Sequence, residues 1–100
     1  MNRFRIGQGW DRHALVSGRD LVLGGVRLES DLGCLGHSDG DPLTHALTDA
    51  VLGAIGQGDI GRHFPPSDDR YKDSASRVFL EYAMGLARAA GWELANADST

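Results

Sequence analysis

Three side chains of the kinds that bind metal ions, Asp11, His13 and His45, are spaced so that they can meet. Asp11 and His13 are two residues apart in a segment expected to be extended, so both side chains point to the same side. His45 lies on a predicted helix, away from its apolar stripe. One carboxylate and two imidazoles leave an open coordination position, which is typical of a catalytic zinc site.

The spacing alone leaves other interpretations of these residues open. An Asp-x-His pair often occurs by chance, and His45 can equally be a surface or interface histidine. If the metal site exists, Asp49 lies one helical turn after His45 and is placed to orient its ring.

A polar stretch from His37 to Asp41 precedes the same helix. Helix N-termini present backbone N–H groups and a positive dipole end, which favour phosphate, and His37 and Ser38 can add hydrogen bonds. Asp41 is expected to cap the helix, and Asp39 to order the loop. The same residue types also form plain turns.

A second polar segment, from Asp59 to Asp68, offers further candidates. Asp59 can accept hydrogen bonds from a polyol, and Gly61 permits close approach of a ligand. The competing interpretation is a solvent-exposed loop without a chemical role. Cys34, the single cysteine, lacks a setting that would activate it as a nucleophile.

The elements that must position these groups follow from pattern and turn chemistry. We expect a β-hairpin in the first third, with residues 4–13 partly extended, a turn at 17–20 and a return strand over 21–28 that bulges at Gly24-Gly25. Residues 29–41 are predicted to be a loop.

Two helices and a final strand are predicted after that loop. The first helix runs from Pro42 to about Ile55, and its apolar stripe comprises Leu43, Ala46, Leu47, Ala50, Val51 and Ala54. Residues 57–73 are predicted to be a loop. The second helix covers about 74–90 and buries Val78, Phe79, Tyr82, Leu86 and Ala89 or Ala90. A further strand is expected from Trp92 onward.

Composition limits the class of protein. The chain has 100 residues, of which 41% are hydrophobic and 24% charged, which fits a single globular domain over residues 1–100. A net charge of −4 argues against a broad nucleic-acid surface. No apolar run or leader pattern predicts a membrane span or signal peptide, and one cysteine fits a reducing, cytoplasmic location. So short a chain benefits from a metal or from oligomerisation.

Five motifs in order resemble the 2-C-methyl-D-erythritol 2,4-cyclodiphosphate synthase family, and together they cover nearly the whole chain. They are Ile6-Gly7-Gln8-Gly9-Trp10-Asp11-Arg12-His13, Leu23-Gly24-Gly25-Val26, Gly36-His37-Ser38-Asp39-Gly40-Asp41, His45-Ala46-Leu47-Thr48-Asp49-Ala50, and Gly58-Asp59-Ile60-Gly61 with Phe64-Pro65.

The resemblance implies an α+β fold, a two-layer sandwich of a mixed β-sheet packed against helices, in a homotrimer with active sites at subunit interfaces. It implies a phosphorus–oxygen lyase of isoprenoid biosynthesis that cyclises 4-diphosphocytidyl-2-C-methyl-D-erythritol 2-phosphate and releases CMP. The implied cofactors are Zn²⁺ or another divalent transition metal, and Mg²⁺ or Mn²⁺ with the substrate diphosphate.

The resemblance also assigns roles to residues. It implies Asp11, His13 and His45 as metal ligands and His37 as the catalytic residue that stabilises the transition state. The implied substrate contacts are Asp11, Arg12, His13, His37, Ser38, Asp59, Ile60, Gly61, Phe64, Pro65, Pro66, Ser67 and Asp68. Pro66 departs from an acidic residue usual in the family, and Gln8 from a common histidine.

Family members continue beyond the point where this chain stops, so the resemblance implies missing C-terminal strands and most of the cytidine pocket. The alternative function is therefore a truncated, catalytically silent relative that binds metal or only assembles. An unrelated zinc phosphohydrolase is a third possibility.

Overall fold

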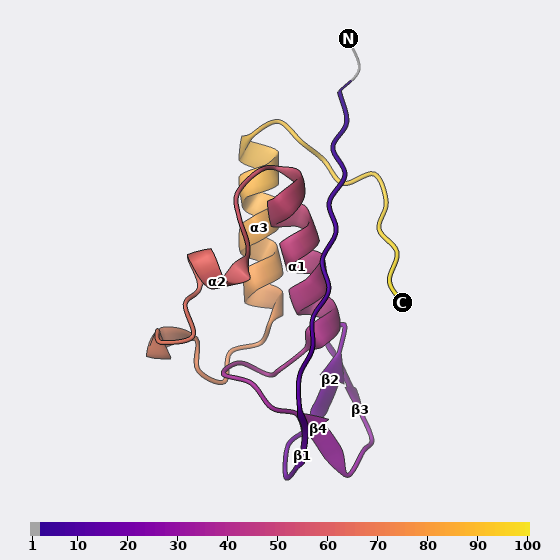
Figure 1. The fold of residues 1–100 in the computed structure, drawn as a ribbon, viewed down its shortest axis with the longest axis vertical. Helices are drawn as coiled ribbons and strands as arrows, with labels where there is room; N and C mark the ends of the chain where they lie inside the picture. Colours follow the sequence, from indigo (N-terminus) through magenta and orange to yellow (C-terminus); the bar gives the residue numbers. More distant parts are fainter. Residues whose placement is uncertain (1–2) are drawn as a thin grey trace.

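The computed structural model describes residues 3–100. Two helices, α1 and α3, lie side by side, and four short strands gather at one end of an elongated molecule of 51 × 28 × 17 Å (Figure 1). The elements are β1 (Leu15–Ser17), β2 (Leu21–Leu23), β3 (Val26–Leu28), β4 (Leu32–Cys34), α1 (Pro42–Ala54), α2 (Ile60–His63), the 3₁₀ helix η1 (Asp69–Tyr71) and α3 (Arg77–Ala89). No helix in this part of the chain is long and apolar enough to cross a membrane.

The strands form two antiparallel pairs. β2 pairs with β3, with Leu21 opposite Leu28, and β1 pairs with β4, with Leu15 opposite Cys34. Gly24 and Gly25 join β2 to β3 with φ angles of 61° and 79°. Positive φ at both central residues is the requirement of the tight turn that best fits the twist of a hairpin.

The predicted hairpin was therefore wrong in its pairing. Residues 21–28 are two strands around a glycine turn, and their partner is not the N-terminal segment. β4 was also missed, because it lies inside the predicted loop over residues 29–41. Its glycine explains the weak signal: a Cβ on Gly33 would lie 2.2 Å from the carbonyl oxygen of Asp20, so the sheet admits no side chain there.

The α+β class is confirmed, with helices and antiparallel strands. The expected mixed sheet is absent from residues 3–100, where both two-stranded sheets are antiparallel. The strand expected from Trp92 is absent as well, since residues 92–100 form no ladder. An extended segment needs a neighbouring strand to pair its N–H and C=O groups, and within the described chain these residues have none.

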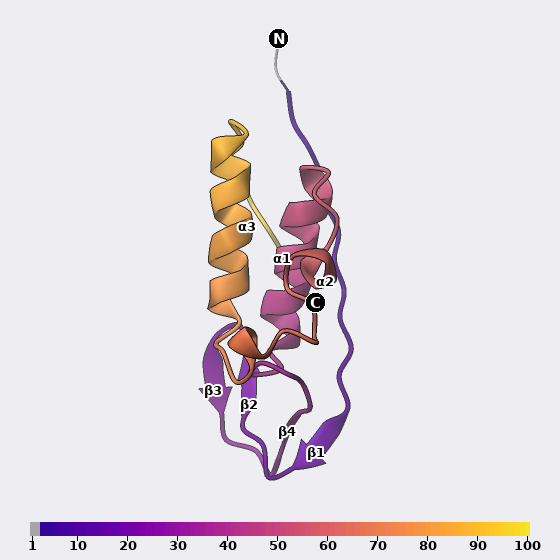
Figure 2. The same cartoon turned by 90° about the vertical axis from the view of Figure 1, so that its left-hand side faces the viewer.

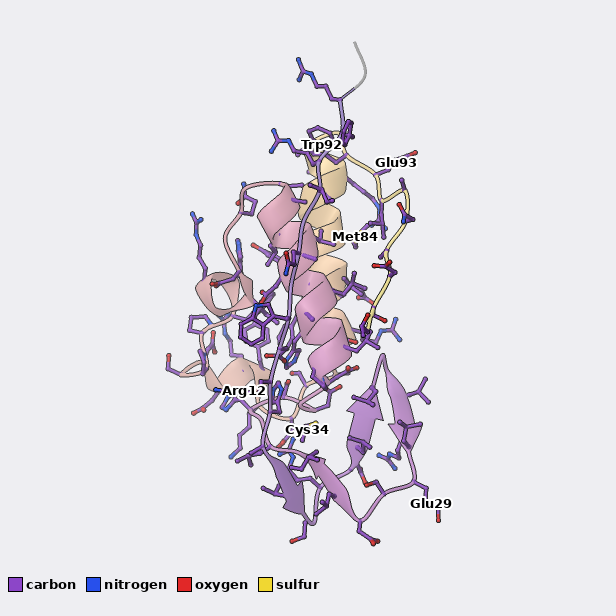
Figure 3. All side chains as sticks on the ribbon, turned by 45° about the vertical axis from the view of Figure 1, so that its right-hand side comes forward. Arg12, Glu29, Cys34, Met84, Trp92 and Glu93 are labelled. Carbon is purple, nitrogen blue, oxygen red and sulfur yellow. The ribbon has the colours of Figure 1, made fainter. Side chains whose placement is uncertain are left out.

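A small apolar core holds α1 against α3. It consists of Val51, Leu52, Ala83 and Ala87, with Ile55, Met84, Leu86 and Trp92 packed around it. Trp92, labelled in Figure 3, also meets the N-terminal segment, where the Arg5 guanidinium lies 4.9 Å from its ring centre.

Both predicted helix faces need correction. The buried residues of α1 are Thr44, Thr48, Val51 and Leu52, and those of α3 are Phe79, Ala83 and Ala87. Leu43, Val78 and Tyr82 keep 38%, 42% and 43% of their surface exposed. Threonines were not counted as core residues, although Thr48 satisfies its hydroxyl within the helix by donating to the Thr44 carbonyl at 2.8 Å.

The alanine face of α1 is covered by the N-terminal segment, which runs along the helix in Figures 1 and 2. A Cβ on Gly7 would lie 1.8 Å from the Ala50 carbonyl oxygen, and one on Gly9 would lie 2.0 Å from that of Ala46. This contact therefore requires glycine, and it sets where residues 10–13 run.

Asp41 connects the β2–β3 turn to α1. Its fully buried carboxylate accepts hydrogen bonds from the Gly24 and Gly25 N–H groups at 2.9 and 2.7 Å, and from the Thr44 N–H and hydroxyl at 3.0 and 2.7 Å. Burial alone would raise the pKa of this carboxyl, but the four hydrogen bonds outweigh it and hold the pKa below its ordinary value. The predicted N-cap is thus confirmed.

Substitution of Gly9 tests the close packing on α1. We expect Gly9→Ala to lower the free energy of unfolding by about 1–3 kcal/mol, because the backbone of α1 cannot yield to the new methyl group. The control is Gly85→Ala, since Gly85 lies in α3 with nothing within 4 Å of a built Cβ. This control should gain about 0.5–1 kcal/mol from helix propensity. Urea titration measures both, and equal stability of the two variants would contradict the packing.

The Asp41 network predicts a pH dependence of stability. Because the folded-state pKa of Asp41 lies below the unfolded value of about 3.9, this stabilisation is fully present above the unfolded pKa and is lost as pH falls through the lower folded-state pKa. Asp41→Asn should cost about 1–3 kcal/mol at pH 7, and the difference from wild type should shrink toward pH 3. The exposed Asp31→Asn serves as control. A pH-independent difference for Asp41→Asn would show that the charge plays no part.

Candidate metal centre

The segment that carries Asp11 and His13 enters the sheet through β1. The Leu35 N–H donates to the Ala14 carbonyl at 2.8 Å, which extends the β1–β4 pairing toward His13. Residues 10–13 form no strand of their own, but their extended backbone still places Asp11 and His13 on one side. Arg12, labelled in Figure 3, is exposed.

His45 approaches from α1, in the first turn set by Asp41. The His45 N–H donates to the Asp41 carbonyl at 3.0 Å, and Pro42 occupies the start of the helix, where no N–H is needed. The imidazole lies near the Phe79 ring of α3, with ring centres 5.9 Å apart and the planes tilted by 54°.

The three predicted ligands come together. Asp11 Oδ2 lies 3.0 Å from His13 Nδ1 and 3.2 Å from His45 Nδ1, and one ligand atom from each residue lies within 4.8 Å of the others. The two imidazole rings are tilted by 49° with their centres 5.3 Å apart.

This arrangement fits a divalent metal ion. His13 Nδ1 is buried and has no hydrogen-bond partner within residues 3–100, although the Asp11 carboxylate is beside it. A buried nitrogen without a partner is costly in a finished fold, and a metal bond would satisfy it. One carboxylate and two imidazoles provide the mixed oxygen and nitrogen donor set that suits zinc and related transition metals.

Asp49 does not play its expected part. Its carboxylate accepts a hydrogen bond from the Ile60 N–H at 2.8 Å and so fixes the start of α2. The ring nitrogens of His45 face Asp11 on one side and two serine hydroxyls on the other. Burial raises the pKa of Asp49, and the charges of Asp59 and Asp11 raise it further.

The loop before α1 is tied to the segment that precedes α3. The Asp39 N–H donates to the Ser74 carbonyl at 3.1 Å, and the Asp73 N–H donates to the His37 carbonyl at 2.8 Å. The expectation that Asp39 orders this loop is confirmed, since its carboxylate accepts hydrogen bonds from the Asp41 and Ser76 N–H groups.

The two predicted phosphate ligands have different environments. Ser38 is buried, and its hydroxyl lies 3.2 Å from His45 Nε2 and 3.3 Å from the Ser76 hydroxyl. His37 is partly exposed, and its Nε2 lies 3.9 Å from Asp69 Oδ1 without a hydrogen-bond partner in residues 3–100. Ser38 is therefore part of the surroundings of the metal cluster, and His37 lies toward η1.

The segment over residues 57–73 is more ordered than a loop. It holds α2 and η1 and projects to one side of the α1–α3 pair (Figure 1). Asp59 caps α2 by accepting from the Arg62 N–H at 3.0 Å, so Ile60 and Gly61 lie in its first turn. His63 Nε2 lies 2.7 Å from the Gln57 carbonyl oxygen and its Nδ1 3.2 Å from the Tyr82 hydroxyl, which attaches α2 to α3.

The residues from Phe64 to Asp68 divide between packing and surface. The Phe64 ring packs on Phe79 with centres 4.7 Å apart, and also contacts Tyr71 and Tyr82. Pro65, Pro66 and Ser67 are exposed. Asp68 caps η1, and hydrogen bonds from Arg70 lower the pKa of its carboxyl.

Sequence reasoning missed Ser76, which is fully buried and lies 2.7 Å from His45 Nε2 through its hydroxyl. It is the N-cap residue of α3, yet its side chain makes no capping hydrogen bond. The sequence pattern indicates only that a serine stands near the start of a helix, so it offers no signal for this contact.

Comparison with known proteins decides the family. A family model described as the YgbB family matches residues 4–100.

The chain belongs to the YgbB family.

Its similarity to individual family members is high. The chain is 61% identical over 97 residues to the 2-C-methyl-D-erythritol 2,4-cyclodiphosphate synthase of Bordetella avium, which covers 97% of this chain and 60% of that protein. A solved structure of such a synthase matches with a TM-score of 0.81 at 52% identity, over 87% of this chain and 58% of that one. A second solved structure of such a synthase, in a CDP-bound form, matches with a TM-score of 0.80 at 53% identity, over 87% of this chain and 58% of that one. The expected family is confirmed, and the chain spans about 60% of its curated relative's length.

Removal of one ligand tests the metal centre of this YgbB family member. We expect Asp11→Asn to weaken Zn²⁺ binding by about 100-fold or more, because even the loss of an outer partner typically costs about 10–100-fold. Asp31→Asn makes the same chemical change at an exposed site and should leave the affinity unchanged. Calorimetric titration with a competing chelator gives both affinities. Equal zinc affinity in the two variants would remove Asp11 from the ligand set.

Proposed function

We propose that residues 1–100 belong to one 2-C-methyl-D-erythritol 2,4-cyclodiphosphate synthase-like domain, and they cover about 60% of the length of a named relative. The proposed reaction is the cyclisation of 4-diphosphocytidyl-2-C-methyl-D-erythritol 2-phosphate with release of CMP. The observation that carries the proposal is the Asp11–His13–His45 cluster, in a chain that is 61% identical to a named synthase over 97 of its own 100 residues.

The proposed reaction needs no nucleophile from the protein. An oxygen of the substrate's own 2-phosphate forms a bond to the β-phosphorus, the bond from that phosphorus to the bridging oxygen breaks, and CMP leaves with both electrons. The site agrees with this requirement. Burial raises the pKa of the Cys34 thiol, as do the nearby charges of Asp41 and Asp11, so Cys34 is a poor nucleophile.

Catalysis then consists of positioning and neutralisation of charge. A divalent metal ion held by Asp11, His13 and His45, proposed to be zinc, would neutralise negative charge on the diphosphate. A second ion, Mg²⁺ or Mn²⁺, is proposed to accompany the substrate. Because the chain has a net charge of −4, its own basic side chains are outnumbered by acidic ones, and metal ions would supply positive charge for so anionic a ligand.

The remaining substrate contacts are proposed from the geometry and the family. His37 has a buried Nε2 without a partner in residues 3–100, which suits hydrogen bonding to a phosphate oxygen as charge develops in the transition state. Ser38 lies between His37 and the cluster. The first turn of α2 offers Asp59, Ile60 and Gly61 to the methylerythritol hydroxyls.

The segment over residues 64–68 and Arg12 complete the proposed binding surface. Pro65, Pro66 and Ser67 are exposed beside the aromatic cluster, and Arg12 is exposed beside Asp11. Asp68 forms an ion pair with Arg70, so we expect the pair, and not the carboxylate alone, to contact the substrate.

We also propose that the protein is a cytoplasmic homotrimer. Two apolar side chains of the N-terminal segment support assembly, since Phe4 and Ile6 keep 88% and 89% of their surface exposed. Contact with another chain would remove this apolar surface from water, which favours assembly.

The activity is tested on the purified chain with Zn²⁺, Mg²⁺ and the cytidyl substrate. We expect CMP and the cyclic diphosphate to appear in equal amounts by chromatography and ³¹P NMR, and Asp11→Asn to lower the rate at least 100-fold, as the loss of a metal-bound charge predicts. Asp31→Asn is the matched control with unchanged rate.

Two outcomes would overturn this function. Zinc binding without CMP release would leave the catalytically silent relative as the better description of this chain. Release of inorganic phosphate in place of a cyclic product would indicate a zinc phosphohydrolase.

A further inference from the structure

Behind His45, on the side away from Asp11, lies a buried chain of polar groups. His45 Nε2 is 2.7 Å from the Ser76 hydroxyl oxygen, and that hydroxyl in turn hydrogen bonds to Asp39 Oδ1. Ser76 has no exposed surface, and Ser38, whose hydroxyl flanks the same nitrogen, is 5% exposed. The orientations of these two hydroxyl groups are therefore set by their protein partners and hardly by solvent.

The directions of the two hydrogen bonds through the Ser76 hydroxyl follow from the Asp39 carboxylate, the acceptor at the end of the chain. The Asp39 carboxylate accepts from the Ser76 N–H at 3.0 Å and from the Asp41 N–H at 3.1 Å, and a carboxylate has no proton to give. Ser76 must therefore donate its single hydroxyl proton to Asp39. Its oxygen is left as an acceptor toward His45, so the proton between Ser76 and His45 belongs to Nε2.

A neutral imidazole carries one N–H, so this network selects the tautomer of His45. With the proton on Nε2, the lone pair is on Nδ1, which lies 3.2 Å from Asp11 Oδ2 within the metal cluster. The competing tautomer would carry its proton on Nδ1 and donate it to Asp11. His45 and Asp11 would then be hydrogen bonded to each other, and Nδ1 would have no lone pair for a metal ion.

We propose that Ser76 and Asp39 are positioning residues that hold His45 in its Nε2–H tautomer and so keep Nδ1 available to a metal ion. The proposal rests on the metal-binding function proposed above. An independent feature agrees with it: Ser76 is the N-cap residue of α3 but makes no capping hydrogen bond, so its hydroxyl is committed to Asp39 and His45.

The tautomer is measured directly on the metal-free protein. Long-range ¹H–¹⁵N correlation at about pH 8.5, where an ordinary imidazole is neutral, distinguishes the two ring nitrogens. We expect His45, assigned by its loss in His45→Ala, to show the Nε2–H pattern in wild type and to shift toward Nδ1–H in Ser76→Ala. Ser74→Ala is the matched control and should keep the wild-type pattern. A wild-type Nδ1–H pattern would overturn the proposal without any variant.

Metal affinity supplies the second measurement. Ser76→Ala should bind Zn²⁺ about 10–100-fold more weakly than wild type, the range typical for loss of a partner behind a histidine ligand. Ser76→Thr retains the hydroxyl and should restore the Nε2–H pattern and much of the affinity. An unchanged tautomer and unchanged zinc affinity in Ser76→Ala would overturn this relay alone. Failure of the wild-type protein to bind zinc would instead overturn the proposed metal centre.

Discussion

Asp41 brings a negative charge into a position with no exposed surface, and its hydrogen-bond donors come from two separate parts of the chain. The β2–β3 turn supplies two backbone N–H groups, and the first turn of α1 supplies the Thr44 N–H and hydroxyl. Because an unpaired buried charge is very costly, the glycine turn and the start of α1 must form together. His45 follows Thr44 directly, so the same carboxylate that joins the β2–β3 turn to α1 also helps to position the imidazole of the candidate metal centre.

Buried polar contacts contribute strongly to the specificity of this fold, because the apolar core between α1 and α3 is small. Its buried members on α1 and α3 are two large aliphatic residues and two alanines. Around them Ser38, Thr44, Thr48 and Ser76 are buried, and each has a hydrogen-bond partner. Fully satisfied polar networks favour one arrangement over others, since a shift in register would leave a buried group unpaired. The loop before α1 and the start of α3 are joined in this way.

The successful predictions of helix starts and of the Asp11–His13 pair depend on neighbouring residues, whereas the missed β4 depends on a distant partner strand. Asp41 and Pro42 define the start of α1 from neighbouring residues alone, and the i, i+2 spacing suffices to place Asp11 beside His13. β4 depends on a distant partner strand and contains Gly33, so it has no alternation to detect. The prediction of a bulge or close backbone approach at Gly24-Gly25 is wrong, because a Gly-Gly pair between apolar runs equally predicts the two-residue hairpin turn that joins β2 to β3. The role of Ser76 follows only from the packing of α3 against α1.

Three carboxylates link the electrostatics of the candidate metal centre to those of the neighbouring α2. Asp11, Asp49 and Asp59 lie close enough that the charges of Asp59 and Asp11 raise the pKa of Asp49, in addition to the larger effect of its burial. Like charges gathered around a partly buried site oppose folding unless a cation or a hydrogen bond compensates each of them. Asp49 has the Ile60 N–H and Asp59 has the Arg62 N–H, whereas Asp11 faces two imidazoles. A divalent cation held by Asp11, His13 and His45 would balance this charge and would also join the N-terminal segment to α1.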